Sequence, residues 1–243
     1  MKGKLILFPV PIGAEEVNHS LPGWNLELLN SCHSFIVEEI RTARRFLKHV
    51  GYIHAIDDTT FFLLNEHTSN TPINERSKQL ESYLEPIERG ENIGLLSEAG
   101  LPCVADPGSL ITQIAQRKGY EIMPLVGPSS LLLSLMASGF NGQNFAFVGY
   151  LPVDKSERIK AIRNLEARVH KEHQTQIFIE APYRNNQMLE SLSETCSDNT
   201  MICVACDLTM ESQTIRSLSA KQWRKERMQL NLHKRNTVFL IGN

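Results

Sequence analysis

The stretch "LLSEAGLPCVADPGSLITQIAQRKG", residues 95–119, decides the fold class. The apolar run "IGLL" (93–96) ends in a loop shaped by glycine and proline, and the residues from 109 onward have helical spacing. A strand, a loop and a helix in this order form the repeating unit of an α/β protein with a parallel sheet. The same alternation is found before and after it, with strands expected at 4–8, 34–39, 59–66 and 120–126 and helices at 41–51, 73–87 and 129–139.

The pattern changes after "NGQN" (141–144) and becomes richer in strands. Strands are expected at 145–151, 175–181, 200–208, 214–219 and 237–242, and helices at 154–173, 183–194 and 221–228. We therefore predict two α/β domains. The N-terminal domain, residues 1–142, has a mainly parallel sheet, and the C-terminal domain, residues 143–243, has a mixed sheet.

The composition is that of an ordinary globular protein. Of the 243 residues, 42% are hydrophobic and 21% charged, and the formal net charge of -2 means that any nucleic-acid partner must meet a local basic patch. The five cysteines follow no metal or disulfide spacing, and the "CVAC" run (203–206) lies in a predicted strand, which favours reduced, buried thiols. No segment approaches the length of a membrane span. We expect a cytoplasmic protein without a metal site.

Three loops after predicted strands contain the unusual residues: "PVPIG" (9–13), "SEAGLPCVADPG" (97–108) and "VGPSS" (126–130). None is a glycine-rich phosphate loop. The carboxylates of Glu98 and Asp106 repel phosphate and suit hydroxyls, amines and positive charge, a set that S-adenosylmethionine offers. A turn leading into a helix explains residues 106–108 equally well, and Ser129 and Ser130 either cap a helix or contact a ligand.

The segment "EEIRTARRFLKHVG" (38–51) predicts a helix with a cationic face. Arg41, Arg44, Arg45 and Lys48 share one side of this helix, and Ala43, Phe46, Leu47 and Val50 share the other. Such a face either binds a phosphate backbone or is simply solvated. Farther along the chain, Glu66 and His67 end a predicted strand and are candidate acid–base groups.

Nine motifs in order along the chain resemble the tetrapyrrole methylase-fold superfamily, the class III S-adenosylmethionine-dependent methyltransferases. The resemblance is strongest to the branch that acts on small-subunit ribosomal RNA. "PVPIGA" matches P-T-P-I-G-N, "EEIRTARRFL" matches E-D-T-R-H-T-R-R-L-L, and "SEAGLPCVADPG" matches S-D-A-G-T-P-G-I-S-D-P-G without a gap. The other six matches are "LNEHT" (64–68), "VGPSS", "ASG" (137–139), "GYLP" (149–152), "EAPYR" (180–184) and "CDLTM" (206–210).

The resemblance implies a homodimer that binds S-adenosylmethionine in a cleft between its two domains. The implied reaction is methylation of the ribose 2'-OH of a cytidine in small-subunit ribosomal RNA. The candidate bases are Glu39, Glu66 and His67, and the sequence does not choose among them. The RNA contacts are Arg41, Arg44, Arg45, Lys48 and Arg184. The cofactor contacts, with Asp106 added from its chemistry, are Pro11, Ile12, Gly13, Ser97, Glu98, Ala99, Gly100, Asp106, Ser129, Ser130, Ala181 and Tyr183.

The chain departs from the family pattern at five positions: Ala14, Glu39, Ile40, Thr42 and Glu98. Because Glu98 stands where the family has Asp, its carboxylate has a longer arm by one methylene. These departures leave two alternatives open. The chain either methylates a tetrapyrrole or another small molecule, or binds the cofactor after losing catalysis.

Overall fold

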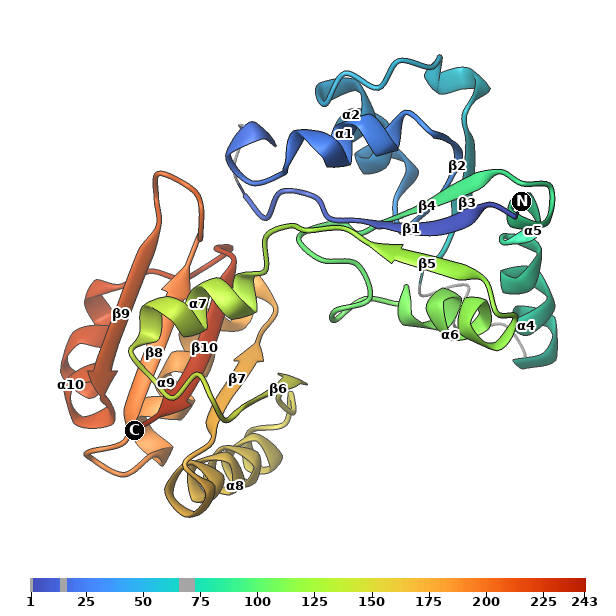
Figure 1. Cartoon of the computed structure of the whole chain (residues 1–243). Coiled ribbons are helices and arrows are strands. Elements are labelled where there is room, and N and C mark those ends of the chain that lie inside the picture. Colours follow the sequence, from blue (N-terminus) through green and yellow to red (C-terminus); the bar gives the residue numbers. More distant parts are fainter. Residues whose placement is uncertain (1, 14–16, 66–72) are drawn as a thin grey trace. The chain divides into compact units, whose positions relative to one another are not determined.

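The computed structural model describes residues 2–13, 17–65 and 73–243, and the chain divides into two compact units, Met1–Ser129 and Ser130–Asn243 (Figure 1). The division falls earlier in the chain than the predicted boundary at 142/143. The reason is that helix α7 (Ser130–Ser138) packs through Leu131 and Leu135 against the second sheet. The two units are described separately below.

The first unit contains a five-stranded parallel sheet in the order β3-β2-β4-β1-β5. All its pairs are parallel, with Leu5 opposite Ile93 and Phe35 opposite Gly94 in the register. This confirms the predicted α/β class. The strands are apolar almost throughout because helices cover both faces of the sheet. They are β1 (Lys4–Phe8), β2 (Cys32–Val37), β3 (Thr60–Leu63), β4 (Asn92–Leu96) and β5 (Glu121–Pro124).

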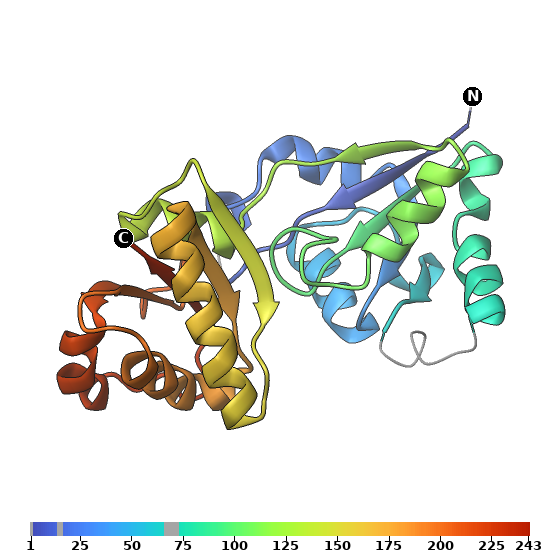
Figure 2. The same ribbon diagram turned by 90° about the horizontal axis from the view of Figure 1, so that it is seen from below.

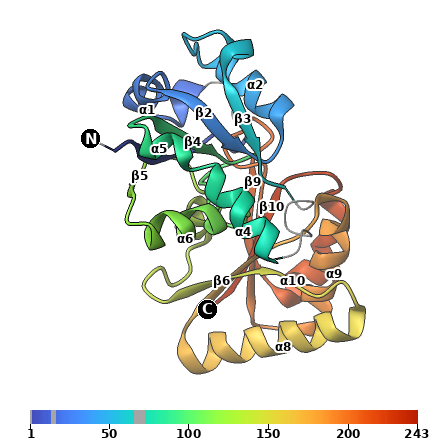
Figure 3. The same ribbon diagram turned by 90° about the vertical axis from the view of Figure 1, so that its right-hand side faces the viewer.

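The helices of the first unit form two layers around this sheet (Figure 3). Leu5 and the alternate residues of the sheet pack against α4 (Ile73–Ser82), α5 (Glu85–Glu88) and α6 (Ser109–Arg117). Ile6 and Phe8 point to the other face and pack with α1 (Gly23–Leu29) and α2 (Ile40–His49). Short 3-10 segments, η1 (Val17–His19) and η2 (Ile56–Asp58), complete the described part of the unit.

Two helices differ from the sequence prediction. The helix expected over residues 73–87 is two helices, because Pro86 has no backbone N–H to continue the first one and instead lies in the first turn of α5. Helix α1 is not predicted by the sequence, because it begins at Pro22 and Gly23, a pair typical of a turn.

The second unit contains a mixed sheet in the order β6-β7-β10-β8-β9, as predicted. The pair β6–β7 is parallel and the other three pairs are antiparallel. Cys203 and Cys206 point to opposite faces of β8, so their thiols are buried in two different clusters. The strands are β6 (Phe145–Tyr150), β7 (Thr175–Ile179), β8 (Met201–Cys206), β9 (Thr214–Ser219) and β10 (Thr237–Gly242).

One face of the second sheet packs against α7, and the other packs against three helices (Figure 2). These are α8 (Lys155–Glu172), α9 (Asn185–Thr195) and α10 (Ala220–Glu226), with η3 (Pro182–Arg184) and η4 (Arg227–Gln229) as short connections. Within the described ranges, no helix is long and apolar enough to cross a membrane.

Candidate active site

The topology of the first sheet places a crevice at its carboxyl edge. After β2 the chain turns toward the α1/α2 face, whereas after the neighbouring strand β4 it turns toward the α6 face. Loops that leave adjacent parallel strands in opposite directions open a crevice beyond the strand ends, where ligands bind in this class of fold.

The loops after β1 and β4 are joined by backbone hydrogen bonds. The N–H of Val10 donates to the carbonyl of Gly100 at 3.0 Å, and the N–H of Gly100 donates back at 3.1 Å. The buried Ser97 hydroxyl donates to the same Gly100 carbonyl at 2.8 Å. The loops predicted to bind the cofactor, 9–13 and 97–100, therefore form one structure.

Two glycines permit the close approach of these loops to the 126–128 segment. Gly100 has φ +76°, and a Cβ on it would lie 3.0 Å from the Ile12 side chain and 3.3 Å from the Pro128 carbonyl. A Cβ on Gly127 would lie 2.1 Å from the Cβ of Pro9, which is inside any normal contact distance. All three predicted loops therefore meet at this edge within the first unit, which ends at Ser129.

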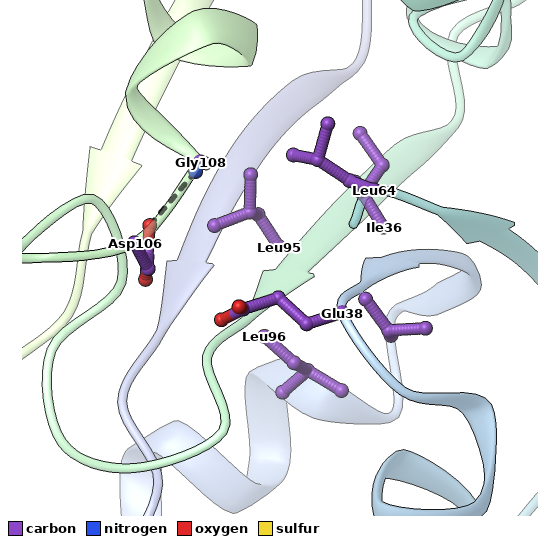
Figure 4. Close-up of a pocket in the computed structure, with 8 residues that line it drawn as sticks. Ile36, Glu38, Leu64, Leu95, Leu96, Asp106 and Gly108 are labelled. Carbon is purple, nitrogen blue, oxygen red and sulfur yellow. Dashed lines mark hydrogen bonds between the residues drawn. The ribbon is translucent and has the colours of Figure 1, made fainter. Parts of the chain in front are cut away.

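A small pocket lies beside these loops, between the ends of β2 and β4 (Figure 4). Its volume of about 10 Å³ is room for about one water molecule. The Glu38 carboxylate points toward Asp106 within it (Figure 4). The other lining residues, none of them basic, are Ile36, Val37, Leu64, Leu95, Leu96 and Gly108.

The loop holds Asp106 by only one of its carboxylate oxygens. Oδ1 accepts hydrogen bonds from the backbone N–H groups of Cys103 and Gly108, both at 2.8 Å. Oδ2 is buried and has no hydrogen-bond partner among the described residues. Cys103 and Ala105 have positive φ values, 68° and 61°, a conformation that costs energy for residues with a side chain and is concentrated at functional sites. The loop therefore presents an unsatisfied acceptor to the pocket.

The carboxyl groups at this edge are harder to ionise than free ones. Burial, and then the charges of Asp106 and Glu98, raise the pKa of Glu38 to about 7. Burial also raises the pKa of Asp106 and of Glu98, and for Glu98 a hydrogen bond from the Thr42 hydroxyl opposes that rise. Glu38 can therefore hold or release a proton near neutral pH.

Glu38 is not among the candidate bases from the sequence, which are Glu39, Glu66 and His67. The Glu39 carboxylate is exposed and accepts the Arg41 backbone N–H at 2.9 Å, so it caps the N-terminus of α2. The signal was the alternation along β2, in which the residue two after the buried Ile36 points back to the same face. The other candidate bases, Glu66 and His67, lie outside the described residues, as does Ala14.

The cationic face of α2 forms as predicted, but one of its charges is already paired. Arg44 donates to Asp57 of η2 in an ion pair. Arg41, Arg45 and Lys48 are exposed. Three cations of this helix are therefore available to a polyanion.

The remaining predicted site residues belong to the second unit. Ser130 begins α7, and Ala181 and Tyr183 lie at η3, where the Tyr183 side chain is exposed. Arg184 forms an ion pair with Glu180, whose side chain is only 1% exposed, and its guanidinium lies 5.7 Å from the centroid of the Tyr183 ring. Arg184 therefore has an internal partner that the sequence does not reveal.

The residues at the edge of the first sheet fit S-adenosylmethionine in their chemistry. Two carboxylates without a basic neighbour in their pocket, one with an unsatisfied oxygen, suit a ligand that carries positive charge and N–H or O–H donors. Gly100 and Gly127 let the three loops pack closely together at this edge. Among the residues the structure describes, no group of three or more His, Cys, Asp or Glu side chains is arranged to hold a metal ion.

Comparison with known proteins identifies the family. The family model for Tetrapyrrole (Corrin/Porphyrin) Methylases matches residues 26–222. Three relatives are named ribosomal RNA small subunit methyltransferase I. The Escherichia coli O157:H7 protein is 29% identical over 216 residues, covering 88% of this chain and 68% of the relative. The Bacillus subtilis protein is 32% identical over 207 residues (85% and 64%). The Thermotoga maritima protein is 30% identical over 213 residues (85% and 84%).

A solved structure shares the fold. The crystal structure of the methyltransferase CobJ aligns with a TM-score of 0.60 over 99% of this chain and 94% of its own, at 18% identity. The chain spans 64% of the Bacillus subtilis relative and 68% of the Escherichia coli one. The match of the family model, the relatives and the shared fold agree that this chain belongs to the tetrapyrrole methylase family and is a methyltransferase.

Proposed function

We propose that this protein transfers a methyl group from S-adenosylmethionine to the ribose 2'-oxygen of a cytidine in small-subunit ribosomal RNA, and that it works in the cytoplasm as a homodimer. The names of its relatives support the RNA class of substrate. The observation that carries the chemistry is the pocket shared by Glu38 and Asp106 beside the three joined loops.

The cofactor supplies a methyl group on a positively charged sulfur. In the first unit, the proposed contacts are Pro11, Ile12, Gly13 and the 97–100 segment. Asp106, farther along the loop after β4, and Ser129, in the loop after β5, are proposed as further contacts. In the second unit, Ser130, Ala181 and Tyr183 are the proposed contacts.

Glu38 is the proposed proton acceptor in this reaction. A ribose hydroxyl is a weak nucleophile at neutral pH, so a base must take its proton as the oxygen bonds to the methyl carbon. With a pKa of about 7, Glu38 is ionised often enough to act and basic enough to accept the proton. The negative charge of Asp106 favours protonation of Glu38 once the proton has moved.

Substrate binding would use the cationic face of α2, because this helix begins next to Glu38. Arg41, Arg45 and Lys48 are the proposed phosphate contacts. Arg44 would have to bind phosphate while it is paired with Asp57. Such contacts set the affinity for RNA and its salt dependence rather than base recognition.

The test combines cofactor binding with methyl transfer. Calorimetry measures binding of S-adenosylmethionine, and a labelled methyl group is then offered to small ribosomal subunits from a strain without the corresponding methyltransferase. Binding with ribose labelling supports the proposal. Binding without any acceptor favours a protein that has lost catalysis, and labelling of a tetrapyrrole alone favours the small-molecule alternative. Absence of cofactor binding contradicts the whole proposal.

A further inference from the structure

Helix α8 of the second unit has a cationic side that the sequence motifs do not include. Its buried side is apolar, with Ile162, Leu165 and Val169 packed in the core cluster. Its exposed side presents four cations, Lys160, Arg163, Arg168 and Lys171. At 100° per residue these four lie within an arc of about 140° on the helix. α8 runs along the outside of the second sheet (Figure 2).

Three of these cations have no counterion. Lys160 pairs with Glu157 at 2.8 Å, whereas Arg163, Arg168 and Lys171 form no ion pair with any described residue. A charged helix that serves only solubility typically pairs its cations with acids three or four residues away. We call Arg163, Arg168 and Lys171 the α8 cationic stripe.

The nearby acids form no ion pair with the stripe. Glu172, four residues after Arg168, is exposed and forms no ion pair with a described residue, and the other acids are bound elsewhere. Glu166 of α8 is buried and accepts hydrogen bonds from the Ser197 backbone N–H at 2.7 Å and from the Thr200 hydroxyl. On the adjacent helix α9, Glu190 and Glu194 both form ion pairs with Arg227. The positive charge of the stripe is therefore not cancelled by α9, the neighbouring helix.

A polyanion is the partner that this surface fits. The chain has a formal net charge of -2, so an unpaired group of three cations on one helix is a local departure from its average charge. From Arg163 to Lys171 the stripe extends about 12 Å along the helix axis. Arginine and lysine side chains spaced along a rigid helix contact successive phosphates without reading bases.

We propose that the α8 cationic stripe binds phosphates of the ribosomal RNA substrate, as a second contact surface in addition to α2. This inference rests on the proposed function for its choice of RNA. It predicts that the second unit contributes directly to RNA affinity and to its salt dependence.

The experiment compares two variants of the full chain with equal net charge. One is Arg163→Gln/Arg168→Gln/Lys171→Gln, which removes the stripe. The control is Lys155→Gln/Lys221→Gln/Lys225→Gln, which removes three exposed lysines of the second unit that lie outside the stripe, one at the start of α8 and two in α10. The probe is an in vitro transcript of small-subunit ribosomal RNA, and the dissociation constant is measured at several salt concentrations from about 50 to 200 mM.

Affinity falls as salt rises, so the slope of log affinity against log salt is negative. In the stripe variant this slope should be less steep by about two to three, and in the control it should stay within about one of the wild type. Cofactor affinity, measured by calorimetry, should be unchanged in both. Equal slopes in the two variants would overturn the inference, and the proposed function would still stand if both methylated RNA. If the wild type binds and methylates no RNA, the proposed function fails, and the stripe proposal fails with it.

Discussion

The two sheets differ in the partners of the acidic residues that follow their strands. In the first unit, Glu38 and Asp106 share an apolar pocket that no basic side chain lines. In the second unit, the buried Glu180 is paired with Arg184, and Asp207 accepts from the Arg235 guanidinium at 2.7 Å. Glu38 follows a strand of the parallel sheet. In the mixed sheet, Glu180 follows β7, which is parallel to β6 and antiparallel to β10, and Asp207 follows β8, which is antiparallel to both of its neighbours.

This contrast separates a reactive edge from a rigid one. A half-buried carboxylate without a cation, such as Glu38, has a raised pKa and can accept a proton near neutral pH. A carboxylate bound to an arginine instead fixes the loops on either side of it. We therefore assign the proton transfer to the first unit and a positioning role to the ion pairs of the second.

The largest expected effect comes from Glu38→Gln. The variant keeps the shape of the side chain but cannot accept a proton, so kcat for methyl transfer should fall by about 10²- to 10⁴-fold. The affinity for S-adenosylmethionine, measured by calorimetry, should fall far less than kcat.

The matched control is Glu39→Gln, which alters the neighbouring carboxylate that caps α2. It should cost about 1 kcal/mol of stability and leave kcat within a few-fold of the wild type. If Glu39→Gln abolishes methyl transfer and Glu38→Gln does not, the base is Glu39, one of the three candidates from the sequence.

The next largest effect is expected in the second unit, from Glu180→Ala. The change leaves the Arg184 guanidinium, whose side chain is 16% exposed, without its counterion. The free energy of unfolding in urea should drop by about 3 kcal/mol, near the lower limit for buried pairs because Arg184 keeps some access to water. Glu190→Ala, which breaks an exposed pair with Arg227, should cost less than about 1 kcal/mol. Equal losses in the two variants would contradict a positioning role for the Glu180 pair.

A smaller effect is expected where the loops of the first unit meet. In Gly127→Ala the new Cβ would lie 2.1 Å from the Cβ of Pro9, so the 9–13 loop must shift. We expect a loss of about 1–3 kcal/mol in stability and weaker cofactor binding. Gly23→Ala meets nothing within 4 Å and should leave cofactor affinity unchanged. Unchanged affinity in Gly127→Ala would show that these loops do not hold the cofactor.

The sequence predicted the architecture more completely than the site. Strands that are buried on both faces of a sheet are short, continuous apolar runs, and glycines mark the ends of the helices between them. These two signals predict the strands of both sheets. The boundary between units was less visible, because α7 follows the first sheet in the chain but packs on the second. Helix α1 was missed because Pro22 and Gly23 have the composition of a turn.

The site shows what short motifs leave out. The motifs predicted that the 9–13, 97–108 and 126–130 loops lie at the same edge of the sheet. The structure shows this, because all three loops follow parallel strands of one sheet. They did not distinguish Glu38 from Glu39, because adjacent residues in a strand differ in direction and not in type. They also did not reveal that Arg184 has a buried partner four residues earlier.

The last prediction concerns the pH dependence of stability. The pKa of Glu38 in the folded protein, about 7, lies above its ordinary value of 4.5, so folding favours the protonated form. The stability that this group contributes is complete below pH 4.5 and is lost as the pH rises through 7. The Tm of Glu38→Gln should therefore exceed that of the wild type by a margin that grows up to pH 7 and then levels off. A margin that does not change with pH would contradict the raised pKa.

The most direct test of the central claim is the rate of a single turnover of methyl transfer as a function of pH, measured for the wild type and for Glu38→Gln. The wild-type rate should rise with pH to a plateau, with a midpoint near the Glu38 pKa of about 7. The variant should be slow throughout and should lack that midpoint. A variant that retains the wild-type rate and the same midpoint would contradict the assignment of Glu38 as the proton acceptor.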